Sequence, residues 1–339
     1  MHDGLVETGL TTETGSAADI TQSKGEEPLG ERRVLMMGVP RSGKTSILSV
    51  IFEEMAPYDT MGMLPSQQRM SYHLVTGVMI YDFPGIDDYS ETQYNTLSPS
   101  VYEGEYTSLV YVIDSQGDVQ ASLSTLFSIM RTAQSVNADI PINIFIHKVD
   151  WVSEELKMDI FQDIQNRVMK NMSYEFLNST FVTFFLTSIF DESVREALSR
   201  VVRRLVPNYS SLETILNSFC SKSSLDKVFL FDVSTKIYLA TDSSPTEGQM
   251  YMFGCQTLDV IEDIAYATTM PPSDEDATMQ RAVVGMESNS KIFTYQVNSY
   301  LTLLCFGSLQ VDRQESLLEF NGSKVAKAIR QVLTFSPAF

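Results

Sequence analysis

The chain has 339 residues, 43% of them hydrophobic, and its 43 acidic against 24 basic side chains give a net charge of −19. This length exceeds what one hydrophobic core usually organises, so two packed domains are expected. A surface this negative repels phosphate backbones and anionic lipids, which argues against nucleic acid as a partner. The three cysteines lie far apart in the sequence and indicate neither a zinc site nor a disulfide framework.

The first 33 residues differ in composition from the rest of the chain. Thr, Glu, Gly, Ser and Asp dominate there without apolar periodicity, so residues 1–33 are expected to form a disordered acidic tail. No segment has the length and apolarity of a signal peptide core or a membrane-spanning helix. We therefore expect no direct insertion of this chain into a membrane.

A phosphate loop is the first informative element. The apolar run 34–37 leads directly into segment 38–45, whose sequence GVPRSGKT satisfies G-x-x-x-x-G-K-[ST]. After a buried strand, such a loop and the helix that follows it present free N–H groups to anions, although the pattern alone could match a surface loop by chance. Lys44 would reach the outer phosphates, and the Thr45 hydroxyl would bind Mg²⁺. The predicted phosphate-binding residues are Gly38, Arg41, Ser42, Gly43, Lys44, Thr45 and Ser46.

A second motif follows the next apolar run, at 78–81. Segment 82–85, with the sequence DFPG, fits the D-x-x-G pattern that follows a central strand in GTP-binding proteins. Asp82 would hold Mg²⁺ through water, and the Gly85 amide would contact the γ-phosphate. This motif predicts a metal ion beside the phosphates.

Two further apolar runs, at 109–114 and 142–146, precede segment 147–150 with the sequence HKVD. In motifs of this NKxD class, the Asp150 carboxylate accepts the N1 and N2 N–H groups of guanine, a pattern that adenine lacks. The stem of Lys148 would lie against the base plane. Guanine is therefore predicted rather than adenine. The base-binding residues are expected to be His147, Lys148 and Asp150, with Ser188 and Ile189 after a fifth strand at 183–186.

Helical spacing alternates with these strands, at 44–55, 119–136, 154–171 and 192–206. This alternation is typical of a mostly parallel sheet with helices on both faces, where ligands bind at the C-terminal ends of the strands. We therefore expect residues 34–206 to form one α/β domain.

The pattern changes over residues 207–339. A one-sided helix around 212–219 precedes a hairpin at 227–240, a helix at 248–266, three strands between 282 and 306, and a final helix at 314–333. The acidic stretch 271–276 is expected to be a solvated loop. This α+β segment contains no charged or nucleophilic constellation, so its expected role is association.

Together these motifs carry a family resemblance. The phosphate loop, the DFPG segment, IHKVD at 146–150, FLFDV at 229–233 and ATDSSP at 240–245 resemble a Rag GTPase of the RagC/RagD type, whose fungal counterpart is the Gtr-two protein. The resemblance implies a Ras-like P-loop G domain at 34–206, which binds GTP or GDP with Mg²⁺. It also implies a roadblock/longin-like dimerisation domain at 207–339.

The resemblance further implies a signalling role. The chain would pair with a RagA/RagB-type GTPase through its C-terminal domain and be recruited from the cytoplasm to the vacuole or lysosome by a Ragulator/EGO-type scaffold. The heterodimer would relay amino-acid availability to the TOR kinase complex, and a GTPase-activating protein would act on it.

The chain departs from the family pattern at two positions. Relatives usually have Gln after D-x-x-G to orient the attacking water, but this chain has Ile86. Very slow intrinsic hydrolysis is therefore expected, unless Asp87, Asp88 or a partner positions the water. Relatives place a Mg²⁺-binding Thr in the first switch, where Gln67 stands in this chain. Ser66 is the predicted replacement, and Thr60 is a second candidate.

Two other functions remain open. A turnover enzyme, such as an ATPase or small-molecule kinase, is disfavoured by the Lys148 and Asp150 pair. A nucleotide-indifferent roadblock scaffold with a degenerate G domain is favoured by Ile86 and the missing Thr, and is disfavoured by the intact phosphate loop.

Overall fold

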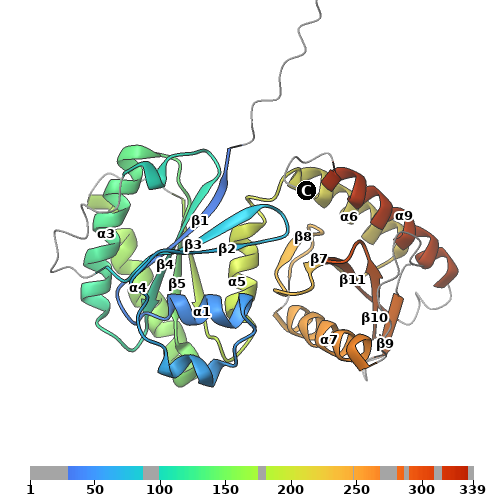
Figure 1. The fold of residues 1–339 in the computed structure, drawn as a ribbon, viewed down its shortest axis with the longest axis horizontal. Coiled ribbons are helices and arrows are strands. Elements are labelled where there is room, and N and C mark those ends of the chain that lie inside the picture. The colour runs from blue at the N-terminus through green and yellow to red at the C-terminus, as the bar shows by residue number, and fades with distance from the viewer. Residues whose placement is uncertain are drawn as a thin grey trace, which may run out of the picture.

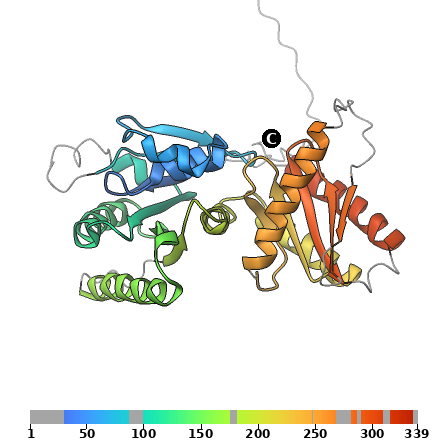
Figure 2. The same cartoon turned by 90° about the horizontal axis from the view of Figure 1, so that it is seen from below.

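The computed structural model describes residues 30–86, 99–174, 181–246, 248–267, 281–285, 290–308 and 315–334. The described chain folds around two β-sheets that lie side by side, each with helices against it (Figure 1; Figure 2). No helix within these ranges is both long enough and apolar enough to cross a bilayer. Residues 1–29, the acidic stretch 271–276 and the pair Asp87 and Asp88 lie outside the described residues.

The first sheet has six strands in the order β2-β3-β1-β4-β5-β6. All of its strand pairs are parallel except that of β2 with β3, which confirms the predicted mostly parallel sheet. The first strand begins two residues inside the expected tail, because Arg32 and Arg33 pair with β3 and so belong to the sheet. The strands are β1 (Arg32–Met37), β2 (Met70–His73), β3 (Val78–Asp82), β4 (Thr107–Asp114), β5 (Ile142–His147) and β6 (Val182–Thr187).

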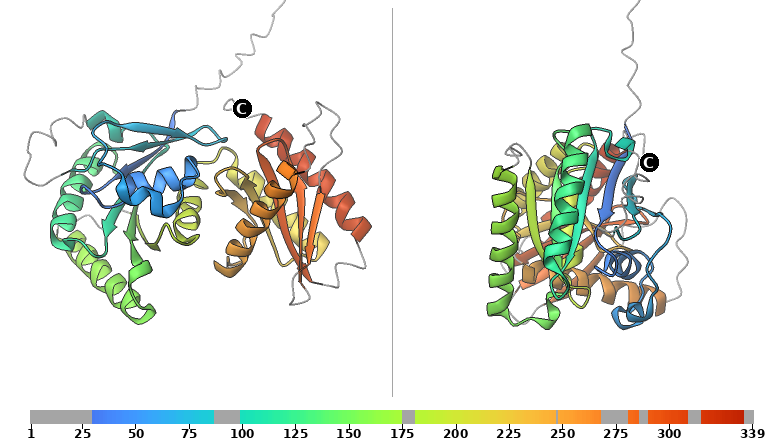
Figure 3. Two further views of the ribbon diagram at one scale, coloured as in Figure 1. Left: turned by 60° about the horizontal axis from the view of Figure 1, so that its bottom comes forward. Right: turned by 90° about the vertical axis from the view of Figure 1, so that its left-hand side faces the viewer.

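Helices cover both faces of this sheet (Figure 3). Alternate residues of β1 point to opposite faces, so Val34 packs into the core beneath α1 and α5, whereas Leu35 packs beneath α3 and α4. The predicted first and last helices are shorter in the structure than expected, because they end at Phe52 and Val202. The helices are α1 (Lys44–Phe52), α3 (Val119–Val136), α4 (Glu154–Tyr174) and α5 (Ser193–Val202), with short 3₁₀ turns η1 (Pro57–Gly62), η2 (Pro99–Tyr102) and η3 (Val149–Trp151).

The second sheet is antiparallel, in the order β8-β7-β11-β10-β9. Helices α6 and α9 cover one of its faces and α7 covers the other (Figure 1). This arrangement confirms the predicted α+β fold of the C-terminal half. Its elements are α6 (Tyr209–Ser223), β7 (Lys227–Asp232), β8 (Tyr238–Thr241), α7 (Gly248–Ala267), β9 (Arg281–Gly285), β10 (Ser290–Gln296), β11 (Leu301–Ser308) and α9 (Glu315–Thr334).

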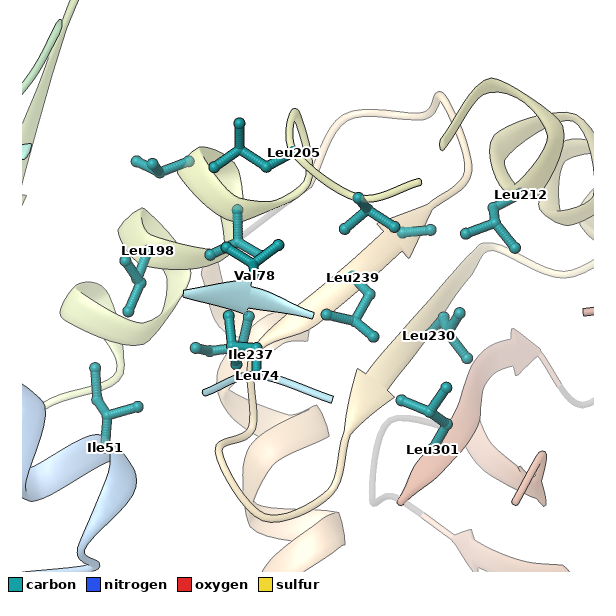
Figure 4. Close-up of a cluster of buried hydrophobic side chains, with 14 of the residues drawn as sticks. Ile51, Leu74, Val78, Leu198, Leu205, Leu212, Leu230, Ile237, Leu239 and Leu301 are labelled. Atoms are coloured by element: carbon teal, nitrogen blue, oxygen red, sulfur yellow. The ribbon is translucent and has the colours of Figure 1, made fainter. Parts of the chain in front are cut away.

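One buried apolar cluster joins the two sheets (Figure 4). It contains Leu74 before β3, Leu198 on α5, and Ile237 and Leu239 at β8. A hydrogen bond crosses the same contact, since the Tyr238 amide donates to the hydroxyl oxygen of Ser199 over 3.1 Å. Helix α5 is therefore shared between the two halves of the molecule.

A buried ion pair explains part of the ATDSSP segment. The Lys227 ammonium lies 3.3 Å from an oxygen of Asp242, and the two side chains are only 1% and 3% exposed. The same carboxylate accepts the Val228 amide over 2.9 Å, and Lys227 also donates to the Asp242 carbonyl over 3.2 Å. Burial lowers the pKa of Lys227, and Asp242 opposes that shift. The pair thus fixes the chain after β8 to the start of β7.

Replacing Asp242 with alanine leaves the Lys227 ammonium buried without a carboxylate. We expect the free energy of unfolding to fall by about 3–5 kcal/mol, as measured by urea denaturation of the full chain. The matched control is Asp163→Ala, which removes an ion pair to Arg167 whose side chains are 47% and 54% exposed. This control should change stability by about 0–1 kcal/mol. Equal losses in the two variants would contradict a structural role for the buried pair.

Candidate functional site

A cleft of about 500 Å³ lies at the C-terminal ends of the first sheet's parallel strands. Eleven of the predicted site residues line it: Arg41, Gly43, Lys44, Thr45, Ser46, Ser66, Gly85, His147, Lys148, Asp150 and Ile189. The other four, Gly38, Ser42, Asp82 and Ser188, do not line the cleft and contact residues that do. The structure therefore brings together positions from five separate segments of the sequence.

The phosphate loop adopts a backbone conformation that suits anion binding. Gly43 has a φ of 103° and Arg41 a φ of 62°, so the loop turns sharply before α1 begins at Lys44. Gly43 offers no side chain to cap α1, which leaves the first amides of the helix for another acceptor. A phosphate group would satisfy these amides.

Lys44 extends beneath the loop instead of into solvent. Its ammonium donates to the carbonyls of Gly38 and Val39 over 3.1 and 3.0 Å, and lies 3.4 Å from the hydroxyl of Ser42. Burial lowers the pKa of Lys44 to about 8, while nearby Asp82 opposes the shift. An anion in the cleft would stabilise the charged form of this side chain.

The metal end of the cleft is built around Asp82, which is fully buried. The Thr45 hydroxyl donates to one carboxylate oxygen of Asp82 over 2.7 Å, and the Ser66 hydroxyl lies 3.5 Å from the same oxygen. The other oxygen has no hydrogen-bond partner among the described residues, and burial raises the pKa of the carboxyl group. Thr60 instead donates its hydroxyl to Pro57 over 2.8 Å, so Ser66 is the candidate beside the carboxylate.

Lys148 and Asp150 form the base end of the cleft. The Lys148 ammonium bridges Asp114, 2.6 Å away, and the Arg41 carbonyl, 2.9 Å away, which fixes its stem across the opening. The Ser188 hydroxyl donates to Asp150 over 2.8 Å. Ser188 therefore orients the carboxylate. Asp114 was not predicted as a site residue, although its place at the end of a strand was a usable signal.

His147 lies between the end of β6 and the phosphate loop. Its ring is 1% exposed, with Nδ1 3.0 Å from the Thr187 hydroxyl. The other edge lies against Gly43 of the phosphate loop, where an added methyl group would stand 2.6 Å from Cδ2. Burial and Lys148 lower the pKa of His147 to about 4, so the ring is neutral near pH 7. It acts as an uncharged spacer between the loops.

Ile86 does not face the cleft. It is 3% exposed and packs in a core cluster that includes Phe83 and Tyr102. Its amide donates to the Gly38 carbonyl over 3.2 Å, which holds the chain after β3 against the phosphate loop. The Ile86 side chain therefore offers nothing to an attacking water. Neither Asp87 nor Asp88, the proposed substitutes, lies in the described part of the chain.

At the cleft, α1 begins without a side-chain cap, Asp82 has one oxygen without a partner among the described residues, and Lys148 is held in place near Asp150. This combination defines a phosphate-loop nucleotide-binding protein with the Ras-like arrangement. A family model described as the Gtr1/RagA G protein conserved region matches residues 33–264. The chain belongs to the Gtr/Rag family, and its similarities place it with the Gtr2 and RagC/RagD type.

Three relatives illustrate this placement. GTP-binding protein gtr2 of Schizosaccharomyces pombe is 35% identical, over 90% of this chain and 98% of its own length. Ras-related GTP-binding protein D of Mus musculus is 35% identical, over 88% of this chain and 68% of its own length. GTP-binding protein GTR2 of Saccharomyces cerevisiae is 40% identical, over 68% and 67% of the two chains.

The tight contact between the phosphate loop and His147 leaves no room for a side chain at position 43. In Gly43→Ala the new methyl group would collide with the His147 ring, at a backbone conformation that costs an L-residue about 1–2 kcal/mol. We expect about tenfold or greater loss of affinity for GDP with Mg²⁺, measured by titration calorimetry.

Gly62→Ala is the matched control for this substitution. Gly62 ends η1, and an added methyl group meets nothing within 4 Å in the described part of the chain. Its affinity should equal that of the unchanged protein. Unaltered binding by Gly43→Ala would show that the loop tolerates a side chain, contrary to the packing described above.

Proposed function

We propose that this chain is a guanine-nucleotide-binding switch that holds GTP or GDP in the cleft. This proposal rests on the position of the Asp150 carboxylate. It lines the base end of the cleft and accepts a hydrogen bond of 2.8 Å from the Ser188 hydroxyl. A fixed carboxylate accepts the two N–H groups on one edge of guanine, and adenine has no matching pair. The beginning of α1 and Lys44 would bind the phosphates.

The residues at the other end of the cleft fit Mg²⁺. Asp82, Thr45 and Ser66 present oxygen atoms, which are the ligands this ion prefers, and one carboxylate oxygen of Asp82 is otherwise unpartnered among the described residues. These side chains would hold the ion through their oxygens, directly or through water. When bound, the ion neutralises charge on the phosphates.

The proposed enzymatic activity is GTP hydrolysis at a very low intrinsic rate. The Ile86 side chain cannot hydrogen bond a water molecule, and it is buried in the apolar cluster away from the cleft. A GTPase-activating protein would supply the missing water-positioning group in trans. This arrangement suits a protein that signals by its bound nucleotide, because slow hydrolysis preserves the GTP-bound state until an activating protein acts.

The C-terminal half supports pairing with a RagA/RagB-type GTPase. Strand β9 ends the described order of the second sheet, and exposed apolar side chains stand on β9, α7 and α9: Val283, Val260, Ile264, Leu317 and Phe320. A sheet edge can pair with a strand of another chain, and exposed apolar side chains can be covered by a partner. As a heterodimer recruited to the vacuole or lysosome by a Ragulator/EGO-type scaffold, the chain would relay amino-acid availability to the TOR kinase complex.

Asp150→Asn tests the base assignment. An amide cannot accept both guanine N–H groups, so GDP affinity should fall about a hundredfold, whereas affinity for xanthosine diphosphate should rise because its added carbonyl accepts the amide N–H. Competition with a fluorescent guanine nucleotide measures both. Asp139→Asn, an exposed carboxylate outside the cleft, should change neither. Displacement of GDP by ADP at equal concentration would favour the ATPase or kinase alternative instead.

Ile86→Gln tests the hydrolysis rate. A glutamine amide in the apolar cluster would be buried without partners, which favours its leaving the cluster for the cleft, where it can orient water. Single-turnover hydrolysis by Ile86→Gln should be faster than by the unchanged chain. Ile86→Ala, which removes packing without adding a polar group, should stay slow. Faster hydrolysis by the unchanged chain than by Ile86→Gln would contradict the proposal.

A further inference from the structure

We propose that Tyr58 and Phe190 form a latch that slows the release of GDP and GTP alike. The latch would hold residues 57–66, the first switch segment, to residues 188–190, the base-binding loop. This inference rests on the proposed nucleotide site and adds two positioning residues to it. The ring centroids of the pair lie 5.1 Å apart with an interplanar angle of 62°, an edge-to-face geometry. Aromatic pairs favour this arrangement.

The segment that the pair would hold forms one wall of the cleft. Six residues between positions 60 and 66 line it: Thr60, Met61, Met63, Leu64, Pro65 and Ser66. Ser66 fixes one end of this wall, because its hydroxyl lies 3.5 Å from the Asp82 carboxylate. Tyr58 stands at the other end, on η1. The contact with Phe190 would therefore hold the second end of a wall whose first end is held at Ser66.

Phe190 is connected to the group that would bind the base. Its amide donates to the Ser188 hydroxyl oxygen over 3.0 Å, and that hydroxyl donates to Asp150 over 2.8 Å. Phe190 and Ile189 also line the cleft themselves. A guanine held by Asp150 would therefore restrain the loop that carries Phe190. Through the ring contact, the same restraint reaches Tyr58 and the switch segment.

Tyr58 and Phe190 are not part of the buried core, so their contact is not needed for folding. Tyr58 is 73% exposed and Phe190 37% exposed, and neither belongs to the buried clusters. The Tyr58 hydroxyl makes no hydrogen bond within the described part of the chain, so the ring alone supplies the contact. The latch acts through the base, which GDP and GTP share. It should therefore not discriminate between the two nucleotides.

Nucleotide release from the full-length chain, in complex with its partner subunit where the two copurify, tests this inference. Fluorescent GDP and a non-hydrolysable GTP analogue are loaded and chased with excess nucleotide. Trp151, the single tryptophan of the chain, lines the cleft and provides a second readout with unlabelled nucleotide. Tyr58→Ala and Phe190→Ala should each speed release about threefold to tenfold, equally for both nucleotides. The double variant should be no faster than the faster single variant.

Two control variants distinguish the latch from general damage. Tyr58→Phe keeps the ring and should release nucleotide at the unchanged rate. Tyr300→Ala removes a tyrosine that is 59% exposed in the turn before β11, and should have no effect. The latch is overturned if Tyr58→Ala leaves release unchanged, if only one nucleotide is affected, or if Tyr58→Phe releases as fast as Tyr58→Ala. Failure of the unsubstituted chain to load GDP would overturn the proposed function as well.

Discussion

The rest of the molecule depends on two buried side chains of opposite charge, Lys44 and Asp82, which lie beside the phosphate loop. The parallel register of β1 with β3 places Met36 opposite Asp82, so the phosphate loop and the DFPG segment leave the sheet side by side. Lys44 is held there by carbonyl groups and Asp82 by hydroxyl groups, and one oxygen of Asp82 has no hydrogen-bond partner among the described residues. Removing ions from water is costly without compensating partners. A nucleotide with Mg²⁺ would supply an anion for the lysine and a cation for the carboxylate, and this complementarity links the fold to its proposed function.

The same sheet explains how distant segments cooperate at the cleft. The strands that end there are covered on both faces, so their ends are fixed by two cores and not by the loops themselves. Ser188 follows β6 and reaches Asp150 after β5, while Lys148 after β5 reaches Asp114 at the end of β4. Each base-site residue is thus held by the neighbouring strand. Helix α5, which follows the base loop, shares a buried cluster with β8, so the C-terminal half packs directly on the element next to the site.

Most of this fold could be predicted from sequence because its signals are local. Buried parallel strands are apolar runs, and the site motifs follow them at fixed positions. The order of the elements and eleven cleft-lining residues could therefore be predicted. Strand β2 was missed because it is short and mostly exposed, although Gly77, with a φ of 73°, marks the turn that pairs it with β3. Other features depend on residues far apart in the chain. They are the packing of Ile86 near Tyr102, the hydrogen bond from Ser188 to Asp150, and the contact between Tyr58 and Phe190. No local pattern specifies such contacts.

The proposed function requires that a guanine nucleotide occupies the cleft in the native protein. The most direct measurement is to denature the freshly purified full-length chain, with any copurifying partner, and to identify the released nucleotides by mass spectrometry. We expect GDP or GTP in an amount close to one per chain, and its loss when Lys44 is replaced by alanine. Release of an adenine nucleotide in that amount, or of no nucleotide from protein that remains folded, would contradict the proposed function.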